Sequence, residues 1–397
     1  MNSTPNGNRK HIVIYGKTNA GKSSLINNLA GQDVALVSNK AGTTTDPVFK
    51  AMELIPIGPV LFIDSAGIND KTSLGDLRVS KTLDLLKRTD LAIYLMDGED
   101  IDKKALKDMK LQFKKFNIPY ILVINKCDKL DEEKLKILKN EYEDAIFIST
   151  YNNSSIDKLK EKIIDVLKEQ EEDVSLIGEL LPYGSKVIMV VPVDSEAPKG
   201  RLILPQVQCI RDCLDHGIKS YVVRDTELKE ALEEIKNVDL VITDSQAFKK
   251  VDEIVPKDIK LTSFSMLFAR QKGDIHEFLK GVEAVRNLKP KDKILISESC
   301  THNTSHEDIG RVKIPKLLSK YVGGDLDITF KVGHEFLEEI EDYKLVIHCG
   351  ACMINRKTVV NRINLCKEKE VPITNYGVIL SFLTNTLDRS KVIFNKL

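Results

Sequence analysis

Gly16-Lys17-Thr18-Asn19-Ala20-Gly21-Lys22-Ser23 is the stretch that decides the fold of the first part of this chain. It follows the apolar run His11–Tyr15 and opens an amphipathic segment, so the pattern G-x-x-x-x-G-K-S stands between a predicted strand and a predicted helix. In that setting the glycines let backbone N–H groups point at phosphate oxygens. We expect Lys22 to bring positive charge to the β- and γ-phosphates and Ser23 to offer its hydroxyl to Mg²⁺. The predicted phosphate contacts come from Gly16, Asn19, Ala20, Gly21, Lys22, Ser23 and Ser24.

A second motif, Asp64-Ser65-Ala66-Gly67, follows the apolar run Val60–Ile63. In this position we expect Asp64 to hold a water on Mg²⁺ and the Gly67 N–H to sense the γ-phosphate. The next residue, Ile68, cannot orient an attacking water as a glutamine would, so slow intrinsic hydrolysis is predicted.

A third motif, Asn125-Lys126-Cys127-Asp128, ends the run Tyr120–Ile124. The Asp128 carboxylate can accept from guanine N1–H and the 2-amino group, which adenine does not offer as a pair, so it should select GTP. Ser149 and Thr150, after the next strand, are expected to support the base. Cys127 lies inside this motif and is not expected to bind metal.

The segment Gly42–Pro47 contains three consecutive threonines between the phosphate loop and Asp64. We expect Thr44, with Thr43 as the alternative, to close over Mg²⁺ in a switch loop. A polar turn with no role is the competing interpretation. Together, Lys22, Thr44, Asp64 and Gly67 form the predicted catalytic set, with Ser23 and Thr44 on Mg²⁺.

Composition limits what else the chain does. The 397 residues carry 59 Lys+Arg and 59 Asp+Glu, and aromatic residues make up only 6%. This balance disfavours a nucleic-acid partner. No apolar run approaches the ~20 residues of a membrane helix, so we expect a cytoplasmic protein without a membrane partner. An odd cysteine count, 7, argues against a disulfide framework.

Apolar runs alternate with amphipathic stretches along the whole chain, which predicts α/β structure with mostly parallel sheets. A charged run at residues 168–173 is followed by Pro182 and Gly184, a composition typical of a domain boundary. We therefore predict a P-loop GTPase domain followed by two smaller α/β domains. Their predicted ranges are 1–172, 175–265 and 266–397. No repeat of fixed period stands out.

Cysteine and histidine residues gather in the last third. Cys300-Thr301-His302 and His348-Cys349-Gly350-Ala351-Cys352 each follow an apolar run, so two strands could deliver thiolates to one crevice. A helix starting near Met353 would add its positive end. Spacing leaves an iron–sulfur cluster, a zinc site and no metal all open.

Two resemblances extend this interpretation. The strings N-A-G-K-S-S-L and A-G-T-T-T-D resemble the tRNA-modification and ribosome-assembly branch of the GTPases. In part of that branch the residue matching Asn19 helps to hold K⁺, which does the work of an arginine finger. A simple turn cap is the alternative role of Asn19.

The C-terminal third is similar to the HydF family of FeFe-hydrogenase maturation GTPases. The similarity rests on C-x-H followed by H-C-x-x-C, on Glu307–Arg311 and on Lys313–Pro315. It implies a GTPase that binds an iron–sulfur cluster, expected to be 4Fe-4S, and carries the diiron precursor to the apo-hydrogenase, with two radical-SAM maturases as partners. It also implies a homodimer formed through residues 175–265.

Carried over by position, the cluster ligands are Cys300, Cys349 and Cys352. His302 and His348 would ligate or support them. Asp194 and Glu298 are competing candidates for a fourth iron ligand. Cys209 and Cys213 are interpreted as a half-buried helix face rather than a metal site, and Cys366 as core.

Two rival functions remain open at this point. One is a tRNA-modification or ribosome-assembly type GTPase with a structural zinc domain. The other is a GTP-dependent redox switch that uses Cys349 and Cys352.

Overall fold

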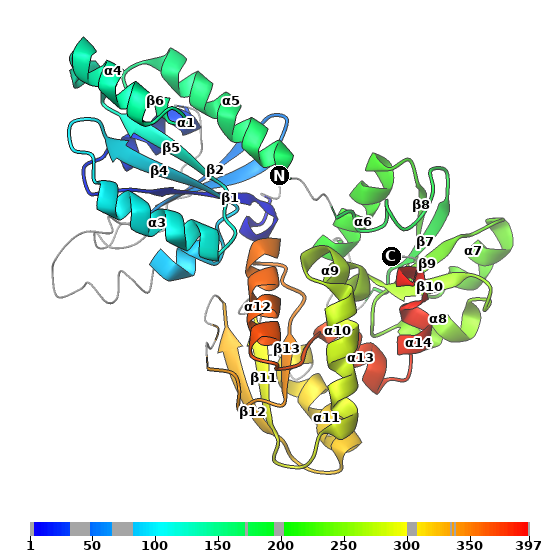
Figure 1. Cartoon of the computed structure of the whole chain (residues 1–397). Coiled ribbons are helices and arrows are strands. Elements are labelled where there is room, and N and C mark those ends of the chain that lie inside the picture. The colour runs from blue at the N-terminus through cyan, green and yellow to red at the C-terminus, as the bar shows by residue number, and fades with distance from the viewer. Residues whose placement is uncertain are drawn as a thin grey trace. The chain divides into compact units, whose positions relative to one another are not determined.

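The structure is a computed structural model that describes residues 4–31, 48–65, 82–170, 174–193, 202–299, 308–333, 336 and 339–395. The chain divides into two compact units, Met1–Glu172 and Asp173–Leu397 (Figure 1). Among the described residues no helix is long and apolar enough to cross a membrane.

The first unit is built on a six-stranded sheet of order β2-β3-β1-β4-β5-β6. Among the described strands of this sheet only β2 runs antiparallel, pairing with β3 at the edge, and every other pair is parallel. Its strands are β1 (Lys10–Tyr15), β2 (Val48–Leu54), β3 (Gly58–Asp64), β4 (Leu91–Asp97), β5 (Tyr120–Asn125) and β6 (Ile146–Phe147). Its helices are η1 (Asn6–Asn8), α1 (Lys22–Ala30), α3 (Lys103–Lys115), η2 (Cys127–Lys129), α4 (Glu132–Glu141) and α5 (Asn153–Glu169), and residues 82–86 are also helical.

Two hydrophobic cores cover the two faces of this sheet. Along β1, Ile12 and Ile14 face a core with α1 and α5, whereas Val13 and Tyr15 face one with α3. The period of two in a strand directs successive side chains to opposite faces, and a sheet covered on both sides must be apolar at every position. This explains the continuous apolar run at His11–Tyr15 and confirms the mostly parallel α/β fold.

The second unit holds two four-stranded, fully parallel sheets. The first has the order β10-β9-β7-β8, with β7 (Lys186–Val190), β8 (Lys219–Val223), β9 (Leu240–Thr243) and β10 (Lys260–Ser263). The second has the order β12-β11-β13-β14, with β11 (Lys293–Glu298), β12 (Asp327–Val332), β13 (Leu345–His348) and β14 (Ile373–Asn375). The helices are α6 (Leu204–Asp215), α7 (Leu228–Glu234), α8 (Phe248–Ile254), α9 (Phe264–Lys272), α10 (Ile275–Val282), η3 (Glu283–Asn287), η4 (Ile309–Lys313), α11 (Ile314–Val322), α12 (Arg356–Glu368), α13 (Tyr376–Leu383), α14 (Leu387–Ser390) and η5 (Val392–Phe394).

The two sheets repeat one topology. In each, the first strand lies beside the second on one flank and beside the third on the other, with the fourth outside the third. The repeat escapes sequence inspection because a shared strand order does not require equal spacing between elements.

One hydrophobic core joins both sheets of the second unit, including Met189, Leu267, Ile296 and Ile347. The chain also returns at its end to the first of the two sheets, where Thr262 Oγ1 donates to Ser390 O at 2.9 Å. The division of this region at residues 265–266 therefore stays a prediction.

Candidate functional site

The phosphate-loop residues lie at the carboxyl edge of the first sheet. Gly16 has φ +152°, and a Cβ there would stand 2.2 Å from Leu95 O, so only glycine lets the loop pass β4. Gly21 has φ +95° and precedes α1, and a Cβ there would stand 2.4 Å from Asn125 Nδ2. Asn19 is exposed and also has a left-handed backbone, with φ 65°. The loop is thus shaped by close contacts with neighbouring strands as well as by its own glycines.

Lys22, Ser23 and Asp64 converge beside this loop. The Lys22 Nζ donates to Lys17 O at 2.8 Å and to Gly16 O at 3.1 Å. The Ser23 hydroxyl donates to Asp64 Oδ2 at 2.6 Å, and Asp64 Oδ1 is buried with no hydrogen-bond partner among the described residues. Burial raises the pKa of Asp64 and lowers the pKa of Lys22. A cation at Ser23 and Asp64 and an anion at Lys22 would offset both burial costs.

The predicted base-binding residues lie at the end of β5, next to the phosphate loop. Asn125 is 1% exposed and donates through Nδ2 to Ala20 O at 2.9 Å, which ties the two motifs together. Lys126 has φ 62° and pairs with Asp97 Oδ2 at 2.5 Å. Asp128 is exposed. The role of Asn125 as a brace for the phosphate loop, and the Lys126–Asp97 pair, did not emerge from the sequence.

The Ser149–Thr150 segment also reaches the nucleotide motifs. Asn28 of α1 donates through Nδ2 to Thr150 O at 2.6 Å, and Cys127 N–H donates to Ile148 O at 3.1 Å. The Cys127 thiol donates to Ile124 O at 3.3 Å. These contacts place both predicted base-supporting residues near Asn125–Asp128. The predictions for Thr43, Thr44, Gly67 and Ile68 concern positions outside the described residues.

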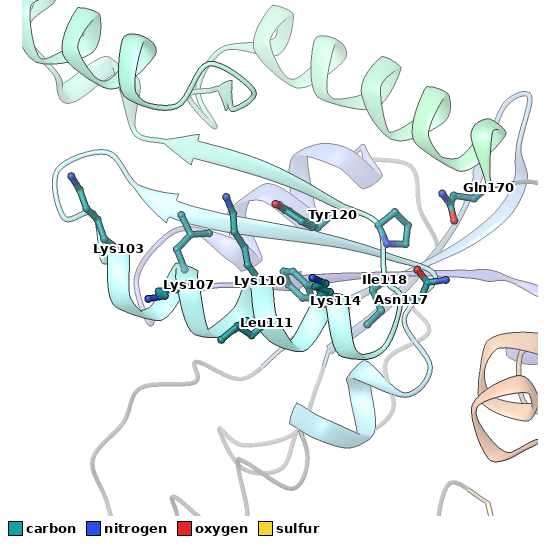
Figure 2. Close-up of a pocket in the computed structure, with 12 residues that line it drawn as sticks. Lys103, Lys107, Lys110, Leu111, Lys114, Asn117, Ile118, Tyr120 and Gln170 are labelled. Atoms are coloured by element: carbon teal, nitrogen blue, oxygen red, sulfur yellow. The ribbon is translucent and has the colours of Figure 1, made fainter. Parts of the chain in front are cut away.

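A surface cavity of about 730 Å³ lies elsewhere in this unit, along α3 and the start of β5 (Figure 2). Lys103, Lys107, Lys110 and Lys114 project from one face of α3 there, beside Tyr120. None of the predicted nucleotide residues lines it, so it is distinct from the phosphate loop.

The cysteine motif lies at the carboxyl end of β13 in the last sheet. β11 and β13 are neighbours, and β11 connects to β12 on its other flank, so the crevice outside their carboxyl ends is a topological switch point, where open α/β sheets bind ligands. Cys349 directly follows β13, and Ser299 directly follows β11. Cys352 is half-buried in the same loop.

The sulfur of Cys349 is surrounded by hydrogen-bond donors. It accepts from Ser299 N–H at 3.0 Å and from Ala351 N–H at 3.4 Å, and the Ser299 hydroxyl lies 2.9 Å away. Burial raises the pKa of the Cys349 thiol, and these hydrogen bonds act in the opposite direction. Such donors stabilise a thiolate, which is the form that binds metals. Ser299 was not foreseen as part of the site.

His348 is completely buried, and both of its ring nitrogens are hydrogen-bonded. Arg362 Nη1 lies 2.9 Å from Nε2, and because an arginine can only donate, Nε2 accepts and Nδ1 carries the proton. Nδ1 then donates to Cys349 O at 2.8 Å. Burial, with the nearby Arg362 charge, lowers the pKa of His348 to about 3. In this arrangement His348 supports the cysteine loop rather than offering a nitrogen to metal.

Glu298, a candidate fourth ligand, ends β11 and is 8% exposed. Its Oε2 accepts from Arg311 at 3.0 Å, and its Oε1 accepts from Tyr376 at 3.4 Å. Gly310 leaves room for them: a Cβ there would stand 2.0 Å from the Tyr376 hydroxyl and 2.7 Å from Glu298 Oε1, so one of these side chains would have to shift. The segment Ile309–Lys313 is a π-helix, a conformation often found at functional sites.

Some of the remaining residues predicted for the cysteine site lie within the described ranges, and others lie outside them. Cys300, His302 and Asp194 lie outside the described residues, and within the described ranges no three His, Cys, Asp or Glu side chains gather to hold a metal. Cys209 and Cys213 are fully buried core residues, more deeply buried than the half-buried face we predicted, and Cys366 is core as predicted. The helix expected near Met353 begins at Arg356, with Asn355 as its cap.

Three family models match successive parts of the chain. Residues 11–126 match the family described as "50S ribosome-binding GTPase". Residues 176–273 match "Hydrogen maturase F dimerization domain", and residues 276–393 match "Hydrogen maturase F tetramerization domain". The chain belongs to the HydF family. The chain therefore carries a GTPase domain, and its matched C-terminal models indicate self-association.

Other relatives share the GTPase part of this HydF-family chain. GTPase Der of Campylobacter hominis is 32% identical over 149 residues, which is 37% of this chain and 32% of that protein. The tRNA modification GTPase MnmE of Flavobacterium psychrophilum is 33% identical over 145 residues, which is 35% of this chain and 31% of that protein. The chain thus spans about a third of the length of these relatives.

A solved structure of a variant of Aquifex aeolicus Era bound to GDP.AlF4⁻ is 19% identical, with 57% of this chain and 98% of that chain covered. Its TM-score of 0.33 is too low to support a conclusion.

Proposed function

We propose that this HydF-family GTPase binds an iron–sulfur cluster through Cys300, Cys349 and Cys352 and carries the diiron precursor to FeFe-hydrogenase. The observation that supports this most directly is that hydrogen-bond donors surround the Cys349 sulfur, among them the Ser299 N–H at 3.0 Å. Cys300 is the next residue in the chain after Ser299. The backbone that leads into Cys300 therefore touches the sulfur of Cys349.

The residues present fit such a group. Soft iron prefers thiolate ligands, and hydrogen bonds to the sulfurs tune the reduction potential of a cluster. The site also lies at the carboxyl ends of strands at a switch point, the place where open α/β sheets bind ligands. When bound, the cluster would supply an iron position to which a precursor attaches. His348 and Arg362 would orient the Cys349 loop, and Glu298, paired with Arg311, would have to leave that pair to bind iron.

We assign the nucleotide to the first unit. Ser23 and Thr44 would hold Mg²⁺, Asp64 would hold a water on it, and Lys22 would contact the phosphates. Asn125, Lys126 and Asp128 would bind guanine, with Ser149 and Thr150 behind the base. The Ser23 hydroxyl lies 2.6 Å from Asp64 Oδ2, so a Mg²⁺ ion on Ser23 would have its bound water within reach of Asp64. Hard Mg²⁺ and soft iron need different ligands, so the nucleotide site and the cluster site are two distinct sites.

Single substitutions at each site test this assignment. After anaerobic reconstitution with iron and sulfide, we expect a brown protein with an EPR signal that appears on reduction. Cys349→Ser should lose the signal while GTP hydrolysis continues, and Lys22→Ala should do the reverse. Cys366→Ala is the matched control, because Cys366 is a buried cysteine in the core and outside the predicted ligand set.

The outcomes separate the candidate functions. A colourless wild-type protein carrying one zinc per chain would refute the scaffold proposal and favour the GTPase with a structural zinc domain. If the protein is brown, it should next be incubated with the diiron precursor made by the two maturases and then with apo-hydrogenase. Hydrogen evolution that depends on Cys349 would support delivery, and its absence would contradict it.

A further inference from the structure

Arg362 is a buried arginine whose charge has no acidic partner among the described residues. It lies on α12 and is 4% exposed. Its Nη1 donates to Ser297 Oγ at 3.0 Å and to His348 Nε2 at 2.9 Å, and its Nη2 donates to Gly333 O at 2.8 Å. The Phe336 ring centroid lies 4.9 Å from its guanidinium carbon. Every partner is neutral, whereas buried charges are normally paired.

The contacts of Arg362 lead directly to the cysteine loop. Ser297 belongs to β11, His348 to β13, and Gly333 follows β12, so one guanidinium spans three neighbouring strands at the switch point. Through His348 the arginine reaches the Cys349 carbonyl, and Cys349 N–H donates to Ser297 O at 2.9 Å. The backbone on both sides of the Cys349 sulfur is therefore held by partners of Arg362.

An uncompensated cation is costly to bury, and it persists where an anion offsets it. Thiolates with an iron–sulfur cluster form such an anion, and reduction adds a further negative charge. A fixed positive charge close by stabilises the reduced form more than the oxidised form and so raises the reduction potential.

We propose that Arg362 is a positioning residue of the cysteine site: it fixes the Cys349 loop through His348, and its charge offsets the negative charge of the bound cluster. This inference rests on the proposed cluster site. An arginine guanidinium is not deprotonated in proteins, so this charge is present at neutral pH.

The test is a redox titration of the reconstituted cluster followed by EPR. Arg362→Gln removes the charge, and Arg362→Lys keeps it. Lys367→Gln is the matched control, because it removes one positive charge from the same helix at an exposed lysine that pairs with Asp274 and Glu277. GTP hydrolysis and thermal melting report whether each variant is folded.

We expect Arg362→Gln to change the ratio of oxidised to reduced cluster at the wild-type midpoint at least tenfold toward oxidised. This corresponds to about 59 mV or more for a one-electron couple. Arg362→Lys should recover most of that change, and Lys367→Gln should give the wild-type ratio.

Each outcome decides the inference. A loaded Arg362→Gln protein with the wild-type midpoint would overturn it, while the proposed function would stand. If Arg362→Gln takes up too little iron for titration, Arg362→Lys decides: a near-wild-type midpoint supports the role of the charge, and a midpoint lowered by about 59 mV or more despite the retained charge refutes it. A wild-type protein without a cluster would refute the proposed function and this inference together.

Discussion

Gly21→Ala should uncouple the phosphate loop from the base-binding motif. Gly21 has φ +95°, and an added Cβ would stand 2.4 Å from Asn125 Nδ2, the atom that donates to Ala20 O at 2.9 Å. The left-handed backbone costs alanine ~1–2 kcal/mol. Breaking the Asn125–Ala20 hydrogen bond adds about 1 kcal/mol, and more if the buried amide finds no new partner.

Together these two costs destabilise the loop conformation that binds nucleotide by about 2–4 kcal/mol. We therefore predict a GTP dissociation constant about 30- to 1000-fold higher than that of the wild type. The assay is titration with a fluorescent GTP analogue. Gly58→Ala is the matched control, because Gly58 has φ +94° in the same unit, and its added Cβ would meet only Glu53 Oε1 at 3.8 Å.

Gly58→Ala should lower stability by a similar backbone cost while leaving GTP affinity unchanged. If Gly21→Ala bound GTP within threefold of wild type, the contact with Asn125 would not organise the loop. If both variants lost affinity equally, the effect would be general destabilisation, and the reasoning from the close approach would also fail.

Three further predictions concern other parts of the chain. Asp212→Ala should lower the free energy of unfolding of the second unit by about 2–4 kcal/mol, because the carboxylate accepts from the N–H groups of Leu176, Ile177 and Gly178 at 2.8–3.0 Å. The measurement is chemical denaturation, with Asp215→Ala at an exposed position as the control. Equal denaturation midpoints for the two variants would contradict this prediction. Burial raises the pKa of Cys366 to about 12, so at pH 8 its thiolate fraction is ~10⁻⁴. Alkylation of Cys366 in the folded protein should therefore be about a thousandfold slower than that of an ordinary thiol, and its rate should rise as the pH increases toward 12. Rapid labelling of Cys366 at pH 8, detected by mass spectrometry, would contradict this prediction. Asn19→Ala should remove any acceleration of GTP hydrolysis by K⁺ over Na⁺, measured as phosphate release, and a wild-type rate that is equal in the two salts would remove the basis for a potassium site.

The sequence anticipated the strand–loop–helix units well, because their signals are local. β1 is the run His11–Tyr15 with one more residue at its start, and the helix expected after the phosphate loop is α1. The edge strand β2 was missed, since its polar and apolar residues alternate poorly and its pairing with β3 is set by a turn. Short helices such as α8 and α9 were also missed, because they depend on packing against their sheets.

Arg362 shows a signal that the sequence did contain. It stands three residues after Val359 and four before Cys366, so helical periodicity places it on the buried face of α12. A cation at such a position marks a buried polar contact, although no local pattern reveals that its partners are Ser297 and His348, which come from two separate strands.

By itself the sequence determined which residue types stand at each site: a glycine-rich turn with Lys22 and Ser23, a carboxylate that we predict to select guanine, and cysteines that follow predicted strands. These follow from short stretches, because a turn or a ligand spacing is a property of neighbouring residues. Only the tertiary structure decided the partners: that Asn125 braces the phosphate loop, that His348 supports a loop rather than offering a nitrogen, and that Arg362 spans three strands. Such contacts join residues from separate strands, and strand order and helix packing, which depend on the whole core, bring them together.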